Sequence, residues 1–228
     1  MIISHSHKFI FIKPLKTAGT SVEAALSHYC SNNDIVTSLN DFWFNRDKNG
    51  EWVHKAMNDE GFHQHDDVQT IKNRIPAETW DSYLKFSMTR NPWDRALSYF
   101  SWKQRRYPEL CPKKRYYHYL GIPYNELQKT KKIFNQFLKT DLPNNDRFYL
   151  IDGKLCVDQI IRYENLVEDF EQICKLIGLP EIKIPHLKAG MRHGKAHYSK
   201  YYNIESQALV SSKHRNDIEL FNYKFEKV

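Results

Sequence analysis

Apolar residues follow two patterns along this chain: short continuous runs and longer stripes with helical spacing. Short runs occupy residues 8–12, 84–89 and 157–163, and their β-branched and aromatic side chains are typical of buried strands. Each run is followed by an apolar stripe, namely Val22, Ala25, Leu26 and Tyr29; Trp93, Ala96, Leu97 and Phe100; and Leu166, Phe170, Ile173, Cys174 and Ile177. The pattern therefore predicts that a strand, a loop and a helix recur along the chain.

The segments between these units predict further helices and one hairpin. Residues 124–138 and 203–223 are predicted to be helical, and Asp152-Gly153 is typical of a hairpin turn. Residues 32–80 are polar with weak periodicity around residues 66–74, so we expect mostly loops with one or two short helices there. Strands that alternate with helices favour an α/β fold, with a central parallel sheet flanked by helices as in P-loop nucleotide kinases.

Length and charge narrow the class of protein. The 228 residues are few for two independent domains, so we expect a single domain over residues 1–228. Lys and Arg outnumber Asp and Glu by 34 to 27, which gives a net charge of +7. This balance favours anionic partners such as nucleotides, acidic glycans or nucleic acid.

The cysteines and the apolar runs bear on metal binding and location. Cys30, Cys111, Cys156 and Cys174 lie far apart without zinc-type spacing, so we expect buried free thiols and no metal site. No apolar window reaches the roughly 18 residues of a membrane span, and no signal peptide is recognisable. We therefore expect a cytoplasmic protein with no membrane partner.

The loop between the first predicted strand and its helix has the composition of an anion site. Backbone N–H groups at a helix start attract negative charge, and a glycine lets the backbone approach a ligand closely. The loop adds positive charge and hydroxyl donors through Lys13, Lys16, Thr17, Gly19, Thr20 and Ser21. The alternative is that these hydroxyl groups only cap the helix.

This loop differs from the phosphate loop of nucleotide triphosphatases. The motif GxxxxGK[ST] would require glycine at position 14 and lysine at position 20, where the chain has Pro14 and Thr20. No predicted strand ends in the acidic pair that would suit magnesium. ATP-dependent phosphoryl transfer is therefore disfavoured.

A second strand, loop and helix unit carries a different set of polar residues. Arg90 ends the predicted strand, and Ser98 lies on the helix face opposite the apolar stripe, beside Asp94 and Arg95. An arginine and a hydroxyl that converge near a strand end can bind a second phosphate. For Arg95 the alternative is that it does not bind phosphate and instead forms an ion pair with an acidic neighbour at the surface.

Together the two loops resemble the sulfotransferases that use 3′-phosphoadenosine-5′-phosphosulfate (PAPS), in particular the carbohydrate-modifying relatives of the Golgi type in soluble form. The motifs KTAGTS and RNPxxRxxSxY are the nucleotide-binding signatures of that family. Residues 161–166 and 217–225 also resemble it, so the likeness covers most of the chain.

The resemblance implies a role for each motif residue. Lys16 would be the catalytic lysine at the bridging oxygen of the leaving nucleotide, and Arg90 and Ser98 would bind the 3′-phosphate. Arg192 lies where relatives fold a basic segment over the nucleotide. The residues implied to bind the 5′-phosphosulfate are Thr17, Ala18, Gly19, Thr20 and Ser21, with Lys13 as a further candidate.

Two histidines are candidates for the base that activates the acceptor hydroxyl. Phe62-His63-Gln64-His65 resembles the FHxH segment of glycan sulfotransferases of the uronyl 2-O type, in which the first histidine is the base. His63 and His65 point opposite ways in an extended segment, so only one is expected to face the acceptor. The alternatives are that both are surface or core histidines, or that an acidic residue of the segment 32–80 is the base.

The basic stretch 102–119 bears on the acceptor. It would attract an anionic acceptor, although a solvated basic face or nucleic-acid binding would give the same composition. We expect a sulfotransferase that acts on a hydroxyl of a carbohydrate, releases 3′-phosphoadenosine-5′-phosphate (PAP), and needs no metal; nucleic acid is disfavoured as a partner. The rival hypotheses are a non-catalytic nucleotide or polyanion binding module and a small-molecule kinase.

Overall fold

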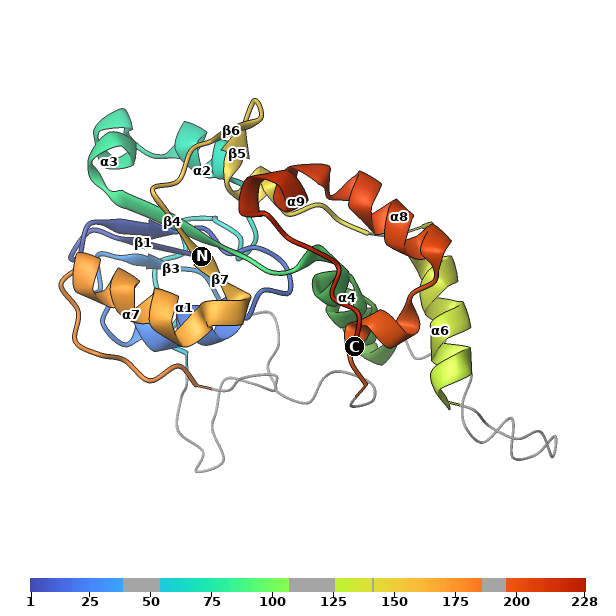
Figure 1. The fold of residues 1–228 in the computed structure, drawn as a ribbon. Helices are drawn as coiled ribbons and strands as arrows, with labels where there is room; N and C mark the ends of the chain where they lie inside the picture. Colours follow the sequence, from blue (N-terminus) through green and yellow to red (C-terminus); the bar gives the residue numbers. More distant parts are fainter. Residues whose placement is uncertain (39–53, 107–125, 141, 186–195) are drawn as a thin grey trace. The chain divides into compact units, whose positions relative to one another are not determined.

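The computed structural model describes residues 1–38, 54–106, 126–140, 142–185 and 196–228 (Figure 1). These residues divide into two compact units. The first consists of Met1–Arg90 with Asn145–Lys188, and the second of Asn91–Asn144 with Ala189–Val228. The expectation of a single domain over the whole chain stays a prediction.

A five-stranded mixed sheet forms the centre of the first unit. Its strands lie in the order β3 (Ile35–Val36), β1 (Ile2–Ser4), β2 (Phe9–Phe11), β4 (Leu84–Thr89) and β7 (Gln159–Arg162). The predicted parallel pairing is confirmed for β2, β4 and β7. It is wrong for β1 and β3, which pair antiparallel, because the connection from β1 to β2 is too short for a crossover.

One face of this sheet is covered by α1 (Gly19–Ser27) and α7 (Leu166–Leu176), which lie on the same side of it in Figure 1. Successive side chains of a strand point to opposite faces, so alternate residues of each strand face these helices. The buried cluster between sheet and helices includes Phe9, Phe11, Phe86, Met88, Ile161, Val22, Leu26, Phe170 and Ile173. This packing holds the start of α1 at the end of β2.

The predicted hairpin and short helices complete the first unit. Asp152 and Gly153 have φ angles of 50° and 75° and join β5 (Leu150–Ile151) to β6 (Lys154–Leu155), which confirms the turn. Two helices occur in the segment predicted to be mostly loop, α2 (Val68–Arg74) and α3 (Ala77–Ser82). Short 3₁₀ turns, η3 (Asp146–Phe148) and η4 (Tyr163–Asn165), precede β5 and α7.

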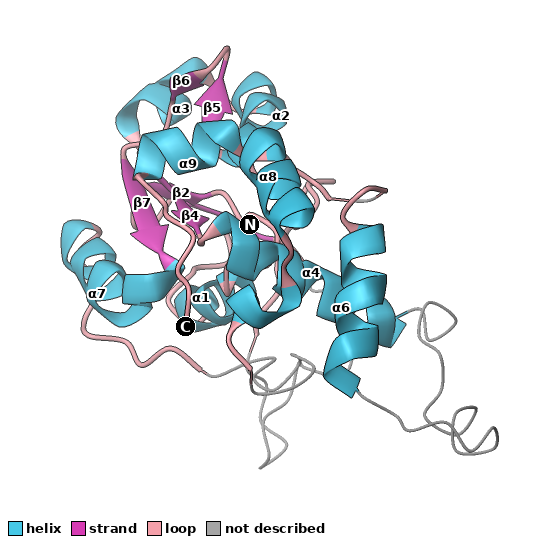
Figure 2. Cartoon of the chain, turned by 45° about the vertical axis from the view of Figure 1, so that its right-hand side comes forward, coloured by secondary structure: helices cyan, strands magenta, loops and turns pink. Residues whose placement is uncertain are grey.

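The second unit is helical and has an aromatic core. It contains α4 (Pro92–Arg106), α6 (Glu126–Phe137), η5 (Tyr198–Tyr201), α8 (Ile204–Lys213) and α9 (Arg215–Phe221), and Figure 2 shows α4, α6 and α8. Phe100 and Phe134 pack with ring centroids 5.2 Å apart, and Tyr202 meets Phe134 edge-on. The predicted helix over residues 203–223 is two helices, because the chain breaks at His214.

The structure describes three of the four cysteines. Cys30 and Cys174 are buried free thiols as predicted, Cys156 is half-buried, and Cys111 lies outside the described residues. Burial raises the pKa of Cys30 to about 12 and those of Cys156 and Cys174 to about 11. Among the described residues, no helix combines the length and apolar character that a membrane crossing requires.

Candidate nucleotide-binding and catalytic site

The loop that leads from β2 into α1 has an unusual backbone. Lys16 and Ala18 have φ angles of 64° and 70°, in the left-handed region that costs a non-glycine residue about 1–2 kcal/mol. Ala18 is the N-cap of α1, and its carbonyl oxygen accepts a hydrogen bond of 2.9 Å from the backbone N–H of Ser21. Left-handed residues at such turns form concave nests of N–H groups that bind anions.

The hydroxyl group of Thr17 lies in this loop without a protein partner. Thr17 is fully buried, and its Oγ1 atom makes no hydrogen bond. A buried hydroxyl left without a partner costs about 1–3 kcal/mol, so such groups commonly meet a ligand or an ordered water. The unpaired Thr17 hydroxyl therefore favours the hypothesis that the loop donates to an anionic ligand over the alternative that its hydroxyl groups only cap the helix.

Asn145 holds the loop from outside the motif. Its Nδ2 atom donates to the carbonyl oxygen of Leu15 at 2.9 Å, and the backbone N–H of Leu15 donates to its Oδ1 atom at 3.3 Å. Asn145 is buried and precedes η3. Sequence reasoning missed this residue, because an asparagine far along the chain carries no local signal of such a contact.

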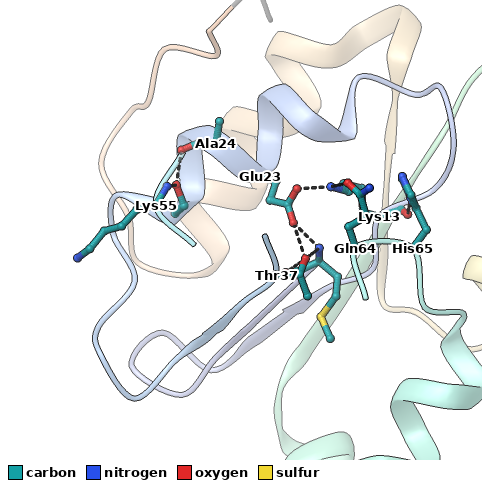
Figure 3. A network of polar contacts seen from close by, with 9 residues as sticks. Lys13, Glu23, Ala24, Thr37, Lys55, Gln64 and His65 are labelled. Atoms are coloured by element: carbon teal, nitrogen blue, oxygen red, sulfur yellow. Dashed lines mark hydrogen bonds and ion pairs between the residues drawn. The ribbon is translucent and has the colours of Figure 1, made fainter. Parts of the chain in front are cut away.

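Lys13 points into the core (Figure 3). Its buried ammonium group pairs with the carboxylate of Glu23 on α1 and donates to Gln64 Oε1 at 3.1 Å. Burial opposes ionisation of Glu23, but the charges of Lys13 and of the Met1 amino group lower its pKa to about 2. A Cβ atom at Gly19 would lie 2.6 Å from Lys13 Cγ, which explains the glycine.

The two candidate histidines lie in different surroundings. His65 Nδ1 is 2.8 Å from the carbonyl oxygen of Lys13, and the ring meets Phe148 edge-on at a centroid distance of 6.4 Å. Burial, followed by the charge of Lys13, lowers the pKa of His65 to about 3, so the ring is neutral. His63 is exposed, and its backbone N–H donates to the carboxylate of Asp66 at 2.9 Å. The structure therefore brings His65 to the loop and leaves His63 at the surface.

Arg74 of α2 orders the residues that precede the histidines. Its guanidinium donates to the carbonyl oxygens of Glu60 and Gly61 at 2.9 and 3.1 Å, and it stacks on the ring of Phe62 at 3.9 Å. These contacts fix a turn in which Glu60 and Gly61 have positive φ angles. This arginine was not among the residues singled out from the sequence.

Arg90 reaches the loop from the end of β4. Its Nη1 atom donates to the carbonyl oxygen of Lys16 at 3.1 Å, and its guanidinium lies over the ring of Tyr163 at 3.8 Å. Lys16 is half-buried beside it. The first unit therefore gathers Arg90, the loop 13–21 and His65, while Arg192 lies outside the described residues.

Ser98 belongs to the second unit, half-buried on α4. The helix begins after Asn91, whose side chain accepts a hydrogen bond of 3.1 Å from the backbone N–H of Trp93. Arg95 is 1% exposed, so the alternative of a surface pair is wrong for it. Its Nη2 atom lies 3.1 Å from His214 Nδ1 within the core of the second unit. Only residues 102–106 of the basic stretch 102–119 are described.

The fold is that of an α/β protein in which a loop with left-handed residues and a buried, unpaired hydroxyl group leads from a central strand into a helix. The sequence model of the sulfotransferase family matches residues 1–224, and the chain belongs to this family. It is also similar to an uncharacterized protein from Archaeoglobus fulgidus, with 32% identity over 111 residues that cover 49% of this chain and 81% of that protein. No solved structure matches the chain.

Proposed function

We propose that this sulfotransferase moves a sulfuryl group from PAPS to a hydroxyl of a carbohydrate and releases PAP. The observation that carries the proposal is the Thr17 hydroxyl, which is buried without a protein partner in the loop between β2 and α1. An anionic ligand in that loop would supply the missing acceptor. The positive charge of Lys16 in the same loop supports a ligand that bears phosphate and sulfuryl groups.

The nucleotide would be held by the two motifs of the sequence. The loop would bind the 5′-phosphosulfate. Its donors are the hydroxyl groups of Thr17, Thr20 and Ser21 and the backbone N–H groups of Ala18 and Gly19. Arg90 is proposed as a ligand of the 3′-phosphate, and Ser98 and Arg192 are further candidates from the sequence. The guanidinium of Arg90 lies over the ring of Tyr163, which restricts its orientation, and a guanidinium can make a bidentate contact with phosphate.

Two residues of this chain would carry the chemistry. Bound PAPS supplies the sulfuryl group. Lys16 offers positive charge to the oxygen that remains on the nucleotide when its bond to sulfur breaks. The Nε2 atom of His65 takes the proton of the acceptor hydroxyl as that oxygen bonds to sulfur, because its Nδ1 atom is held by the carbonyl oxygen of Lys13. We therefore propose His65, and not His63, as the base.

Two features of the sequence bear on the acceptor. The resemblance of residues 62–65 to the segment of glycan sulfotransferases favours a carbohydrate, and the net charge of +7 is compatible with an anionic one. The metal-free reaction and the cytoplasmic location stay predictions from the sequence.

A turnover assay with labelled PAPS tests the proposal. The purified protein is incubated with monosaccharides, glycans, lipids and phenols, with and without magnesium, and in parallel with labelled ATP. We expect transfer from PAPS to a carbohydrate and none from ATP. Transfer from ATP alone would favour the kinase, whereas binding of PAP without transfer to any acceptor would favour the non-catalytic module.

Titration calorimetry and two variants test the roles of the motif residues. PAP should bind far better than AMP, because Arg90 and Ser98 would contact only a 3′-phosphate. Lys16→Ala should lower turnover much more than PAP affinity, and Arg90→Ala should do the reverse. Lys55→Ala, at an exposed lysine outside the loop, is the matched control for both measurements. Equal affinity for PAP and AMP would remove the basis of the 3′-phosphate assignment.

A further inference from the structure

We propose that Lys13 is a positioning residue that orients the base, and that its ion pair with Glu23 serves this purpose. The sequence grouped Lys13 with the residues that bind the nucleotide. The inference rests on the proposed function only in taking His65 as the base. What Lys13 does to His65 can be measured without any turnover.

The side chain of Lys13 points into the core, away from the surface of the loop. Its ammonium group is buried against Glu23, which also accepts a hydrogen bond of 3.1 Å from Thr37 (Figure 3). The stem of Lys13 passes beneath Gly19 so closely that a Cβ atom there would lie 2.6 Å from Lys13 Cγ. Lys13 therefore supports the loop from the core side, and its charge is balanced by a carboxylate of the protein.

Two contacts then join Lys13 to the segment that carries the base. Its side chain donates to Gln64 Oε1 at 3.1 Å, and its backbone carbonyl oxygen lies 2.8 Å from His65 Nδ1. Because a carbonyl oxygen can only accept, the Nδ1 atom carries the proton and the Nε2 atom keeps a lone pair. Adjacent residues of one segment are thus held by one residue at the end of β2.

The charges around His65 come from three elements. Lys13 follows β2, Glu23 lies on α1, and the Met1 amino group precedes β1. On the remaining side the ring meets Phe148, over whose own ring the Arg147 guanidinium lies at 4.8 Å. The effect of Lys13 on the imidazole exceeds that of Glu23. Removal of both charges should therefore raise the pKa of His65.

The test compares the wild type with the double variant Lys13→Met/Glu23→Gln, which keeps both side-chain sizes and removes both charges of the ion pair, while the Met1 amino group next to Glu23 is present in both proteins. Long-range ¹H–¹⁵N NMR of the histidine rings, assigned with His65→Gln, reports the tautomer and pKa of His65. Calorimetry reports PAP affinity. We expect the wild type to show the Nδ1–H tautomer, and the double variant to show a higher pKa with both tautomers present.

PAP affinity of the double variant should stay close to that of the wild type. Turnover should fall on the order of 10²-fold, as expected when a catalytic group is misplaced, and its acid limb should move to higher pH. Lys16→Met should lower turnover without changing the His65 signals.

Three outcomes would overturn the inference. The first is an Nε2–H tautomer in the wild type, which can be read even if the double variant does not fold. The second is an unchanged His65 titration in the double variant. The third is a loss of PAP affinity in the double variant with an unchanged His65 tautomer, which would return Lys13 to the nucleotide site. If no acceptor is ever sulfated, the proposed function fails while the NMR result on Lys13 and His65 stands.

Discussion

The side-chain amide of Asn145 binds Leu15 through both backbone groups of that residue, at 2.9 Å to its carbonyl oxygen and 3.3 Å from its N–H. The amide thereby satisfies the backbone N–H and carbonyl groups of Leu15, as a neighbouring strand would do in a sheet. Lys16 and Ala18 adopt left-handed backbone angles just beyond this contact. A backbone of that kind persists only when its surroundings determine it, and Asn145 is part of those surroundings.

Asn145→Ala should therefore affect stability and ligand binding together. Loss of both hydrogen bonds removes these partners from the half-buried backbone groups of Leu15, at a cost of about 1–3 kcal/mol in the free energy of unfolding for the two bonds together. The loop should also relax, so PAP affinity measured by calorimetry should fall. Asn73→Ala, at an exposed position of α2, is the control and should change neither quantity. A stability loss at unchanged PAP affinity would show that Asn145 supports the fold alone.

Two threonines should respond in opposite ways to replacement by valine. Thr17 Oγ1 makes no hydrogen bond in the protein, so Thr17→Val should leave the melting temperature unchanged or higher while PAP affinity falls. Thr37 Oγ1 contacts the Met1 amino group at 2.6 Å and Glu23 at 3.1 Å, so Thr37→Val should lower the melting temperature and spare PAP affinity. Thermal melts and calorimetry on both variants decide this. A Thr17→Val protein that melts lower with full affinity would contradict the assignment of Thr17 to the ligand.

Much of the fold could be predicted because its central elements are long or strongly patterned. The run 84–89 is β4 residue for residue, and Asp152-Gly153 forms its turn with both φ angles positive. The apolar run of β1 ends at Ser4 and β3 has two residues, whereas the run that contains β2 has four consecutive apolar residues from Phe9 to Ile12. Without them the antiparallel part of the sheet was missed. The C-terminal helix breaks at His214, which is buried and has φ and ψ angles of −117° and 33°, and no local pattern in the sequence marks this break.

The site residues also include some that could be predicted from the sequence and some that could not. The loop 13–21 and Arg90 could be predicted, because helix starts and strand ends leave a signal in neighbouring residues. Asn145 and Glu23 could not, because their partners lie far away in sequence or depend on which way a lysine turns. The choice between His63 and His65 depends on which of them faces the loop, and the alternation of an extended segment leaves that open.

His214 should make the stability of the protein depend on pH. Burial, followed by the charges of Arg95 and Lys213, lowers its pKa to about 2, against 6.5 for an exposed histidine. Between these values the unfolded chain binds a proton that the folded chain does not. The free energy of unfolding should therefore fall as the pH drops below 6.5, by about 1.4 kcal/mol per pH unit from this group. His65 and His54 act in the same direction down to about pH 3 and 4.

Urea denaturation of the wild type and of His214→Gln between pH 6.5 and 4.5 measures this contribution. The variant keeps a polar side chain next to Arg95 but cannot take up the proton on unfolding. The free energy of unfolding of the variant should fall less steeply with decreasing pH than that of the wild type. The difference in slope should be about 1.4 kcal/mol per pH unit, which corresponds to one proton. Parallel slopes for the two proteins would mean that His214 is protonated in the folded state as well.

The last prediction concerns which histidine is the base. An acceptor hydroxyl is a very weak acid, so attack at sulfur is fast only if a neutral group takes its proton as the new bond forms. His65 is neutral, and its Nδ1 atom is occupied by the carbonyl oxygen of Lys13, which leaves Nε2 for the acceptor. His65→Gln can still donate to that oxygen but cannot act as a base. We expect it to lose on the order of 10²-fold in turnover while PAP affinity is retained.

The exposed His63 is the matched control, and His63→Ala should remain active. The pH profile gives a second, independent test, because kcat/KM reports the pKa of the essential base in the free enzyme. With the pKa of His65 lowered to about 3, the profile should show no inflection due to the base between about pH 5 and 8. If kcat/KM instead rises through an ionisation near neutrality that His63→Ala abolishes, and His65→Gln stays active, then His63 is the base. His65 would in that case only tie the segment to Lys13.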